Sequence, residues 1–174
     1  PDSELCIFHA PPGEKDPAVT REAFLSAISD TAESSREKEF VGARFRDLDL
    51  SDRVIDPDDN YTIVLLNAEI QGELELDETT LTNKLQLSHS ELDGGLSAKD
   101  SDLIGGIECY GCTFDSTVKF TDARLESRPL FAHSTFGYGV QFNRAEFPAG
   151  ASFTGSSFES YAEFKRVECA GSMN

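Results

Sequence analysis

The chain is 174 residues long, about one domain, and it contains 32 acidic and 15 basic residues, which gives a net charge of −17. This charge excludes nonspecific nucleic-acid binding, because the phosphate backbone requires a basic surface. No apolar run approaches the roughly 20 residues of a membrane-spanning helix and no signal-peptide pattern is present, so we expect a soluble protein with no membrane insertion and no direct nucleic-acid contact.

The first residues read as a loop that carries one candidate metal-binding pair. Cys6 and His9 stand in a Cys-x-x-His spacing ahead of the loop residues Pro11, Pro12 and Gly13. The spacing could supply two of the four ligands of a structural zinc ion, with the other two coming from residues outside this sequence. Because two ligands do not make a site, we favour a buried thiol beside a surface histidine, and we expect no metal and no cofactor.

Helix signals follow and complete an N-terminal segment of residues 1–39. Asp16 suits the N-cap and Pro17 the first turn, and apolar residues recur at helical spacing at Phe24, Leu25, Ile28 and Ala32. We expect the helix to end near Lys38 and Glu39. It could bind a peptide or a membrane, but its short apolar stripe and acidic polar face favour a lid over the first coil of the next segment.

Residues 40–169 form a repeat, which from Ala68 onward has a period of eleven residues. Large apolar residues alternate at spacings of six and five, and most have a small or apolar residue two positions earlier. Such pairs are typical of short strands that point two side chains at one axis, and Gly pairs together with Pro129 and Pro148 exclude a helix. The repeat predicts an all-β solenoid with a core of Ile70, Leu81, Leu92, Leu103, Phe114, Phe120, Phe131, Phe136, Phe142, Phe147, Phe153, Phe158 and Phe164.

These residues resemble the pentapeptide-repeat family, whose unit is a small residue, a polar residue, Leu or Phe, and two polar or Gly residues. Clean five-residue units stand at residues 43–47 (ARFRD) and 48–52 (LDLSD), and the main run is similar to a variant with alternating five- and six-residue units. The resemblance implies a right-handed quadrilateral β-helix in which each coil spans two periods of the repeat. A flatter, two-faced coil of a single period fits the sequence equally well, and only the resemblance favours four faces.

An acidic stretch, residues 56–60 (DPDDN), interrupts the repeat after Ile55. It lacks the Gly and the distant Glu of a calcium-binding EF-hand loop, so we interpret it as a solvated insertion in a turn. Ile63 and Leu65 resume the register, because they stand two full periods before Leu85 and Leu87.

Cys109 and Cys112 have the spacing of a redox or zinc pair, but both fall on inward columns, and so does Cys169. We interpret all three as small buried hydrophobic residues, which indicates a reducing, cytoplasmic environment. His89 and His133 fall at outward or corner positions, and we expect both at the surface.

The acidity has two interpretations. One is a halophilic surface, favoured by the shortage of Lys, with six in the chain. The other is mimicry of DNA, a role that some pentapeptide-repeat proteins play; but residues 1–108 carry a net charge of −16 and residues 109–174 only −1, whereas a mimic should be charged along its whole length. The predicted acidic face consists of Glu69, Glu73, Glu75, Asp77, Glu91, Asp93, Asp100 and Asp102.

The end of the repeat has no evident cap, since only a short tail, residues 170–174, follows Cys169. An uncovered solenoid end exposes strand edges and apolar surface. We therefore expect an interface there, either with a second copy of the chain or with a further domain of a longer protein, of which this chain, beginning at Pro1, would be a part.

No nucleophile elbow, phosphate-binding Gly loop or set of four metal ligands is present, and a filled solenoid core offers no catalytic pocket, so we expect no enzyme activity. The leading functional hypothesis is a rigid, non-catalytic scaffold for binding an unidentified protein partner. The alternative is an inhibitor that mimics DNA and binds a topoisomerase such as gyrase.

Overall fold

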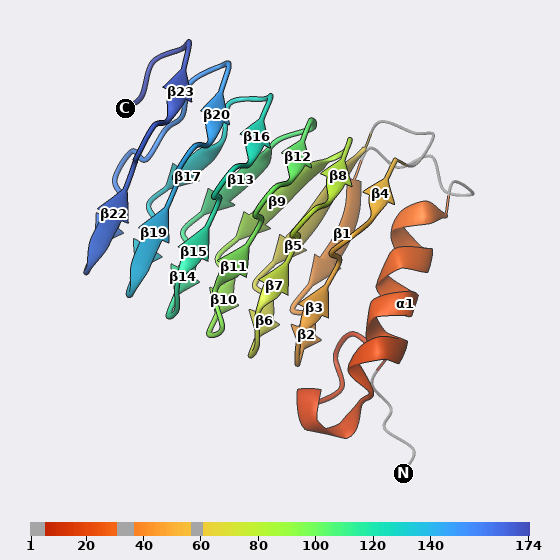
Figure 1. Ribbon diagram of the computed structural model, residues 1–174. Coiled ribbons are helices and arrows are strands. Elements are labelled where there is room, and N and C mark those ends of the chain that lie inside the picture. The colour runs from red at the N-terminus through yellow and green to blue at the C-terminus, as the bar shows by residue number, and fades with distance from the viewer. Residues whose placement is uncertain (1–5, 31–36, 57–60) are drawn as a thin grey trace.

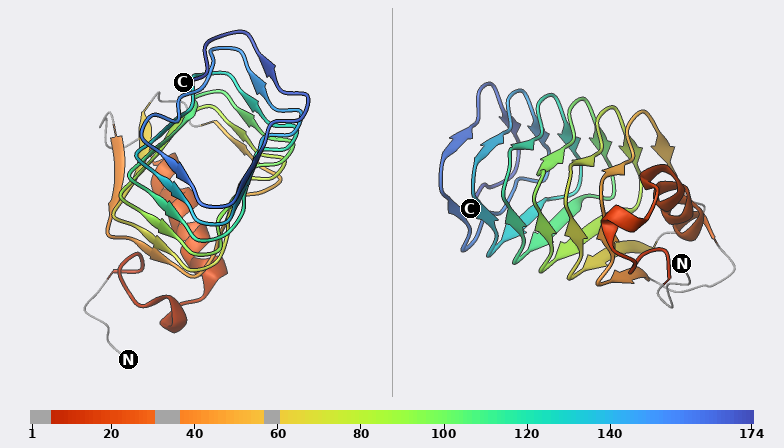
Figure 2. Two further views of the ribbon diagram at one scale, coloured as in Figure 1. Left: turned by 90° about the vertical axis from the view of Figure 1, so that its left-hand side faces the viewer. Right: turned by 90° about the horizontal axis from the view of Figure 1, so that it is seen from below.

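The computed structural model describes residues 6–30, 37–56 and 61–174, which form a parallel β-solenoid preceded by one α-helix (Figure 1). The strands of successive coils pair into four sheets, three with six strands and one with five. Seen along its axis, each coil has the four-sided outline visible in Figure 2. The predicted all-β solenoid with four faces is therefore confirmed.

Each sheet takes one strand from each coil. Sheet A consists of β1 (Glu37–Val41), β5 (Thr62–Leu66), β9 (Lys84–Ser88), β13 (Ile107–Tyr110) and β17 (Leu130–Ala132). Sheet B consists of β2 (Arg44–Phe45), β6 (Glu69–Ile70), β10 (Glu91–Leu92), β14 (Thr113–Phe114), β18 (Thr135–Phe136) and β21 (Ser157–Phe158). Sheet C consists of β3 (Leu48–Asp49), β7 (Leu74–Glu75), β11 (Leu96–Ser97), β15 (Val118–Lys119), β19 (Gly139–Gln141) and β22 (Tyr161–Glu163). Sheet D consists of β4 (Val54–Ile55), β8 (Thr80–Leu81), β12 (Asp102–Leu103), β16 (Arg124–Leu125), β20 (Glu146–Phe147) and β23 (Glu168–Cys169).

From β5 onward, paired residues in neighbouring coils are two periods of the repeat apart. Ile63 pairs with Leu85, and Leu92 pairs with Phe114. This spacing excludes the two-faced coil of a single period. The first coil is longer, since Phe45 pairs with Ile70 and Ile55 with Leu81. The extra residues follow β4, where the sequence predicts an insertion; most of that stretch, residues 57–60, lies outside the described residues.

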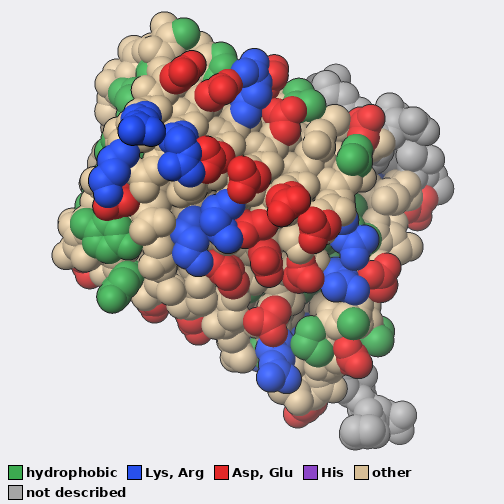
Figure 3. All heavy atoms as spheres, in the orientation of Figure 1, with side chains coloured by type: hydrophobic (Ala, Val, Ile, Leu, Met, Phe, Trp, Pro, Cys, Tyr) green, Lys and Arg blue, Asp and Glu red, His purple; other side chains and the backbone are tan. Residues whose placement is uncertain are grey.

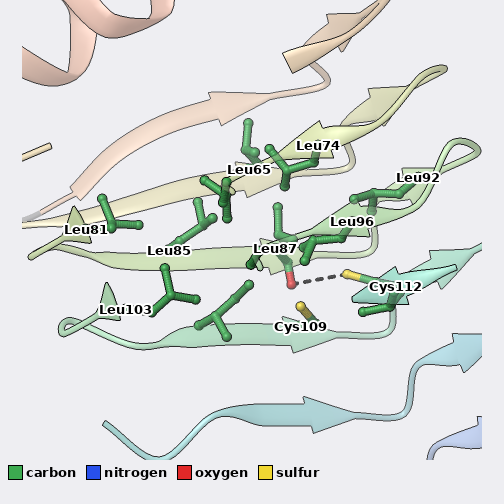
Figure 4. Packing of buried hydrophobic residues seen from close by; sticks show 14 of the residues in the cluster. Leu65, Leu74, Leu81, Leu85, Leu87, Leu92, Leu96, Leu103, Cys109 and Cys112 are labelled. Carbon is green, nitrogen blue, oxygen red and sulfur yellow. Dashed lines mark hydrogen bonds between the residues drawn. The ribbon is translucent and has the colours of Figure 1, made fainter. Parts of the chain in front are cut away.

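The interior is filled by columns of buried apolar side chains, one above another. Figure 4 shows leucines of successive coils packed around Cys109 and Cys112. The predicted core residues from Ile70 to Phe147 are all at most 2% exposed. The corners between sheets carry positive φ, as at Gly95 (84°), Gly106 (88°) and His89 (51°), so the second glycine of each Gly pair lies at a corner.

The C-terminal coils replace leucine with phenylalanine, and their rings form parallel stacks. Phe114, Phe136 and Phe158 stack with centroid separations of 5.1 and 4.9 Å and interplanar angles of 5°. Phe120 and Phe142 stack at 5.3 Å. Rings in different columns meet edge to face, which is the other favourable geometry of aromatic pairs.

Helix α1 (Pro17–Ser29) covers the first coil, as predicted for a lid. Asp16 caps it, with its carboxylate accepting from the Ala18 amide at 2.8 Å. Phe24 and Ile28 are buried, and the Phe24 ring lies 4.6 Å from that of Phe40.

The predicted helix end near Lys38 and Glu39 is wrong. The helix stops at Ser29, and Glu37–Val41 forms strand β1, which pairs with β5. Pairing gives this segment a full ladder and buries Phe40 under the helix, which a continued helix would not do. The predicted helical residue Ala32 lies outside the described residues.

We predict that Phe136→Ala lowers the free energy of unfolding by about 3–5 kcal/mol, because it removes a buried ring stacked between two others. Phe158→Ala is the matched control, since it lies in the same column but is 36% exposed, and it should cost clearly less. Urea denaturation followed by circular dichroism measures both. Equal losses would contradict the stacked-column description.

Candidate functional site

The eight residues of the predicted acidic face do not form a single flat surface. They lie on three sheets and in the turns between them. Glu69 and Glu91 are on sheet B, Glu75 is in β7 of sheet C with Glu73 just before that strand, Asp102 is on sheet D, and Asp77, Asp93 and Asp100 are in turns. Figure 3 shows carboxylates on one side of the molecule interspersed with Lys and Arg side chains.

Basic side chains pair with three of these carboxylates. Arg44 lies 2.8 Å from Glu69, Lys119 lies 3.0 Å from Glu73, and Lys99 lies 2.5 Å from Asp77. Sequence reasoning did not identify these partners. The coil period could have found one of them, because Asp77 and Lys99 are one coil apart.

Glu75 ends strand β7 and Asp77 follows two residues later, but the two carboxyl groups have opposite electrostatic environments. Burial alone would raise the pKa of Asp77, but hydrogen bonds from Lys99 and Ser97 outweigh it and hold that pKa below its usual value. Burial raises the pKa of Glu75, and the charges of Asp49, Asp77 and Glu73 raise it further. Asp77 is therefore stabilised as a carboxylate, whereas Glu75 is not.

We predict opposite effects for two conservative substitutions on this surface. Asp77→Asn should lower the free energy of unfolding at pH 7 by about 1–2 kcal/mol, since hydrogen bonds to a charged group are lost. The pKa of Asp77 is lowered on folding, so its contribution is present above the unfolded pKa of about 3.9 and is lost as the pH falls through the folded pKa. The deficit of Asp77→Asn should therefore shrink below about pH 4.

Glu75→Gln is the matched control. The pKa of Glu75 is raised on folding, so its charge destabilises the native state above the folded pKa, and the variant should be as stable as the wild type at pH 7 or more so. Urea denaturation at pH 7 and pH 3 compares the three proteins. Equal losses in both variants at pH 7 would show that neither environment is as described.

The cysteines differ in their surroundings. Cys109 and Cys112 are buried, as predicted, and the Cys112 thiol donates to the Leu87 carbonyl at 3.3 Å (Figure 4). Burial raises the pKa of Cys109, which makes it a poor nucleophile. The prediction for Cys169 is wrong: it pairs with Phe147 on the inward column but is exposed, because no further described coil lies over it.

Cys6 and His9 are close together, with Sγ and Nδ1 2.9 Å apart, and His9 Nε2 lies 2.8 Å from the Val41 carbonyl oxygen. The prediction of a buried thiol is wrong, since Cys6 is exposed. Among residues 6–30, 37–56 and 61–174, no group of three or more His, Cys, Asp and Glu side chains could hold a metal ion, so the described chain adds no ligand to this pair. His89 and His133 are exposed at corners, as predicted.

A surface hollow of about 430 Å³ adjoins this pair. Its wall includes His9, Val41 and the rings of Phe8 and Phe40. Polar residues also line it: Asp30, just after helix α1, and Glu37, Lys38 and Glu39 in strand β1. The hollow lies beside the capping helix at the N-terminal end of the solenoid.

The last coil, which we call the end coil (residues 153–173), presents inward side chains to solvent, and Phe158, Phe164 and Met173 are 36–41% exposed. Tyr161 is 39% exposed as well, but it lies on the outer face of sheet C, since its neighbour Ala162 is the residue that pairs with the buried Val140. The sequence predicts that Phe158 and Phe164 are core residues. Each does stack on the phenylalanine one coil earlier, as predicted, but each is exposed on its other side, so the prediction that they are buried is wrong. Strands β21, β22 and β23 are the outermost members of their sheets. Tyr161 and Met173 lie outside the two large-apolar columns, and the sequence analysis did not identify them.

The chain matches no family model, no curated protein and no solved structure. Within the described residues, no helix is both long and apolar enough to cross a membrane. What the molecule does must therefore be argued from its surfaces.

Proposed function

We propose that this chain is a rigid, non-catalytic scaffold that binds protein through its end coil, and that its partner there is a second copy of itself. The observation that carries the proposal is the difference between the two ends. Helix α1 seals the first coil with Phe24 and Ile28, which are at most 1% exposed, whereas the corresponding aromatic columns of the end coil are open.

The open strand edges favour a protein partner over a small ligand. Three sheets end in β21, β22 and β23, whose outer backbone groups have no strand beside them within the described chain. An exposed parallel edge over an apolar surface is a template for further strand pairing. A second copy turned by a two-fold axis would present the same edges and the same open rings, so the contact closes on itself.

The charge distribution favours contact between like ends. Residues 1–108 carry a net charge of −16 and residues 109–174 only −1. Two copies would repel each other through their N-terminal coils but not through their C-terminal coils. Joining the end coils also places the two acidic segments, residues 1–108 of each copy, at opposite ends of the dimer.

We further propose that the coils are of the pentapeptide-repeat type. Ile70, Leu76, Leu81 and Leu87 follow one another at alternating spacings of six and five residues, and they belong to the sides of sheets B, C, D and A in turn. Each side of the coil thus corresponds to one unit of the repeat, which supports the assignment made on the sequence resemblance.

We predict that the protein sediments as a dimer at micromolar concentration and that the double variant Phe158→Glu, Phe164→Glu sediments as a monomer with unchanged β-structure. The variant places two charges in an apolar contact, which is unfavourable unless they are paired. Val54→Glu is the matched control, because Val54 is 75% exposed on sheet D, away from the end coil, and should leave the dimer intact. A wild-type protein that stays monomeric at all concentrations would contradict self-association.

The alternative, a DNA mimic that inhibits a topoisomerase, is less well supported. Three of the eight carboxylates proposed for it are paired with Arg44, Lys99 and Lys119, and the eight are distributed over three sheets and the turns between them. We predict no inhibition of gyrase supercoiling at a large excess of the protein. Dose-dependent inhibition that is lost when the eight acidic residues are neutralised would instead establish mimicry.

A further inference from the structure

The N-terminal turn holds a thiol and an imidazole in a fixed arrangement. Cys6 begins the turn, and its carbonyl accepts from the amides of His9 at 2.9 Å and Ala10 at 3.1 Å, which brings the His9 ring back over the Cys6 side chain. The turn is anchored to the solenoid, because the Arg44 amide donates to the Phe8 carbonyl at 2.7 Å and the Phe8 ring packs edge-on against Phe40. The pair is thus part of the capped end of the structure.

The Val41 carbonyl determines which tautomer of His9 is present. A carbonyl oxygen can only accept a hydrogen bond, so His9 Nε2, 2.8 Å away, must carry the proton. In the neutral ring Nδ1 then has a free lone pair, and this lone pair faces Cys6 Sγ at 2.9 Å. A base oriented by a third group and facing a nucleophile is the arrangement that activates thiols by proton transfer.

The electrostatic environment supports this transfer. Partial burial by itself raises the pKa of the Cys6 thiol, but hydrogen bonds with the Phe8 backbone and the His9 side chain outweigh it and lower that pKa. The hydrogen bond to Val41, followed by the bond to Cys6, raises the pKa of His9. Lys15 also faces the pair, and Asp30, Glu37, Lys38 and Glu39 line the adjoining hollow.

The other three thiols lack this combination. Cys109 and Cys112 are buried in the core. Cys169 is exposed, but its thiol donates at 3.2 Å to the carbonyl of Gly171, which cannot take up a proton. Cys6 is therefore the one cysteine of the four that is both exposed and hydrogen-bonded to a base.

We propose that Cys6 is a reactive thiol that undergoes exchange with small-molecule disulfides, with His9 as its general base. His9 Nδ1 takes the thiol proton, and the Cys6 thiolate attacks one sulfur of the disulfide. A bond forms between Cys6 Sγ and that sulfur while the original sulfur–sulfur bond breaks. The departing thiolate takes the proton back from His9 and leaves as a thiol, so the exchange needs no further oxidant or reductant. The hollow is lined by His9 and by the Phe8 and Phe40 rings, so it lies beside the base of the pair, while Cys6 itself is exposed to solvent.

The chain supplies its own comparison thiol for a test. The variant Cys169→Ser leaves Cys6 as the exposed cysteine, and Cys6→Ser leaves Cys169. Each native protein is mixed with the neutral disulfide dithiodipyridine, and the release of thiopyridone is followed from pH 5 to pH 8. At pH 6 we expect the Cys169→Ser protein to react about tenfold faster than Cys6→Ser, since only Cys6 has an activating base. Equal rates for the two thiols at every pH would overturn the proposal.

A second variant separates the base from simple accessibility. His9→Gln in the Cys169→Ser background should bring the Cys6 rate at pH 6 to within about twofold of that of Cys169, with an unchanged circular dichroism spectrum. An unchanged fast rate in this variant would overturn the role of His9. If the variant unfolds, the pH profile of the intact Cys6 protein decides: reactivity that persists to lower pH than that of Cys169 supports the thiolate–imidazolium pair, and parallel profiles refute it.

Incubation of the Cys169→Ser protein with cystamine, followed by mass spectrometry of its peptides, identifies the modified residue. We expect one added half-cystamine on the peptide with Cys6, removed by dithiothreitol. An adduct on Cys109 or Cys112 instead would show that the core opens and that Cys6 is not the preferred site.

Discussion

The parallel pairing of residues one coil apart is the constraint on which the rest of the structure depends. The Glu91 amide donates to the Ala68 carbonyl at 2.9 Å, and the Thr113 amide donates to the Ser90 carbonyl at 3.0 Å, so each coil is the hydrogen-bonding partner of the next. Because this register is fixed, side chains one coil apart must stack, and a column must keep to residues that can be buried, as in the column of Leu87, Cys109 and Phe131. The column of Phe114, Phe136 and Phe158 is the result. Extra residues are tolerated only at a corner, as after β4, where they do not alter the strands on either side.

The same constraint explains how much the sequence could predict. The inward positions and the insertion after Ile55 are visible in a single chain, because every coil repeats the pattern that defines them. The number of sheets is not, because the eleven-residue period fits two faces as well as four, and only the pairing of residues two periods apart decides between them. The helix end could not be located in this way. Local signals at Lys38 and Glu39 suit a helix, but β1 is determined by its pairing with β5, a strand of the next coil. Burial at the last coil was overestimated for a related reason. Phe164 and Cys169 occupy inward positions of the repeat, but a periodic pattern does not show which coil is the last one covered by another.

The candidate sites were predicted less well than the fold because they depend on contacts that the repeat does not encode. The Cys-x-x-His spacing of Cys6 and His9 is visible in the sequence, but the group that orients His9 is a backbone carbonyl 32 residues away, and a carbonyl has no sequence signature. The acidic residues show the converse. Their number is evident from composition, yet their electrostatic effect depends on partners such as Lys119, which reaches Glu73 across 46 residues. Spacing identifies residue types, whereas geometry determines what each group can do.

A filled solenoid leaves chemistry and recognition to its surface and its two ends, and here the ends differ. The capped end carries the thiol and the imidazole, and the end coil carries the open aromatic columns. Five intervals between six strands, at about 4.8 Å each, separate them by about 24 Å. A small group attached to Cys6 therefore cannot reach the end coil of its own chain. In a pair of molecules joined through their end coils, the two Cys6 thiols would lie at opposite outer ends. The proposed modification of Cys6 and the proposed self-association would thus be physically independent, and any dependence of one on the other would have to be transmitted through the register of the coils between them.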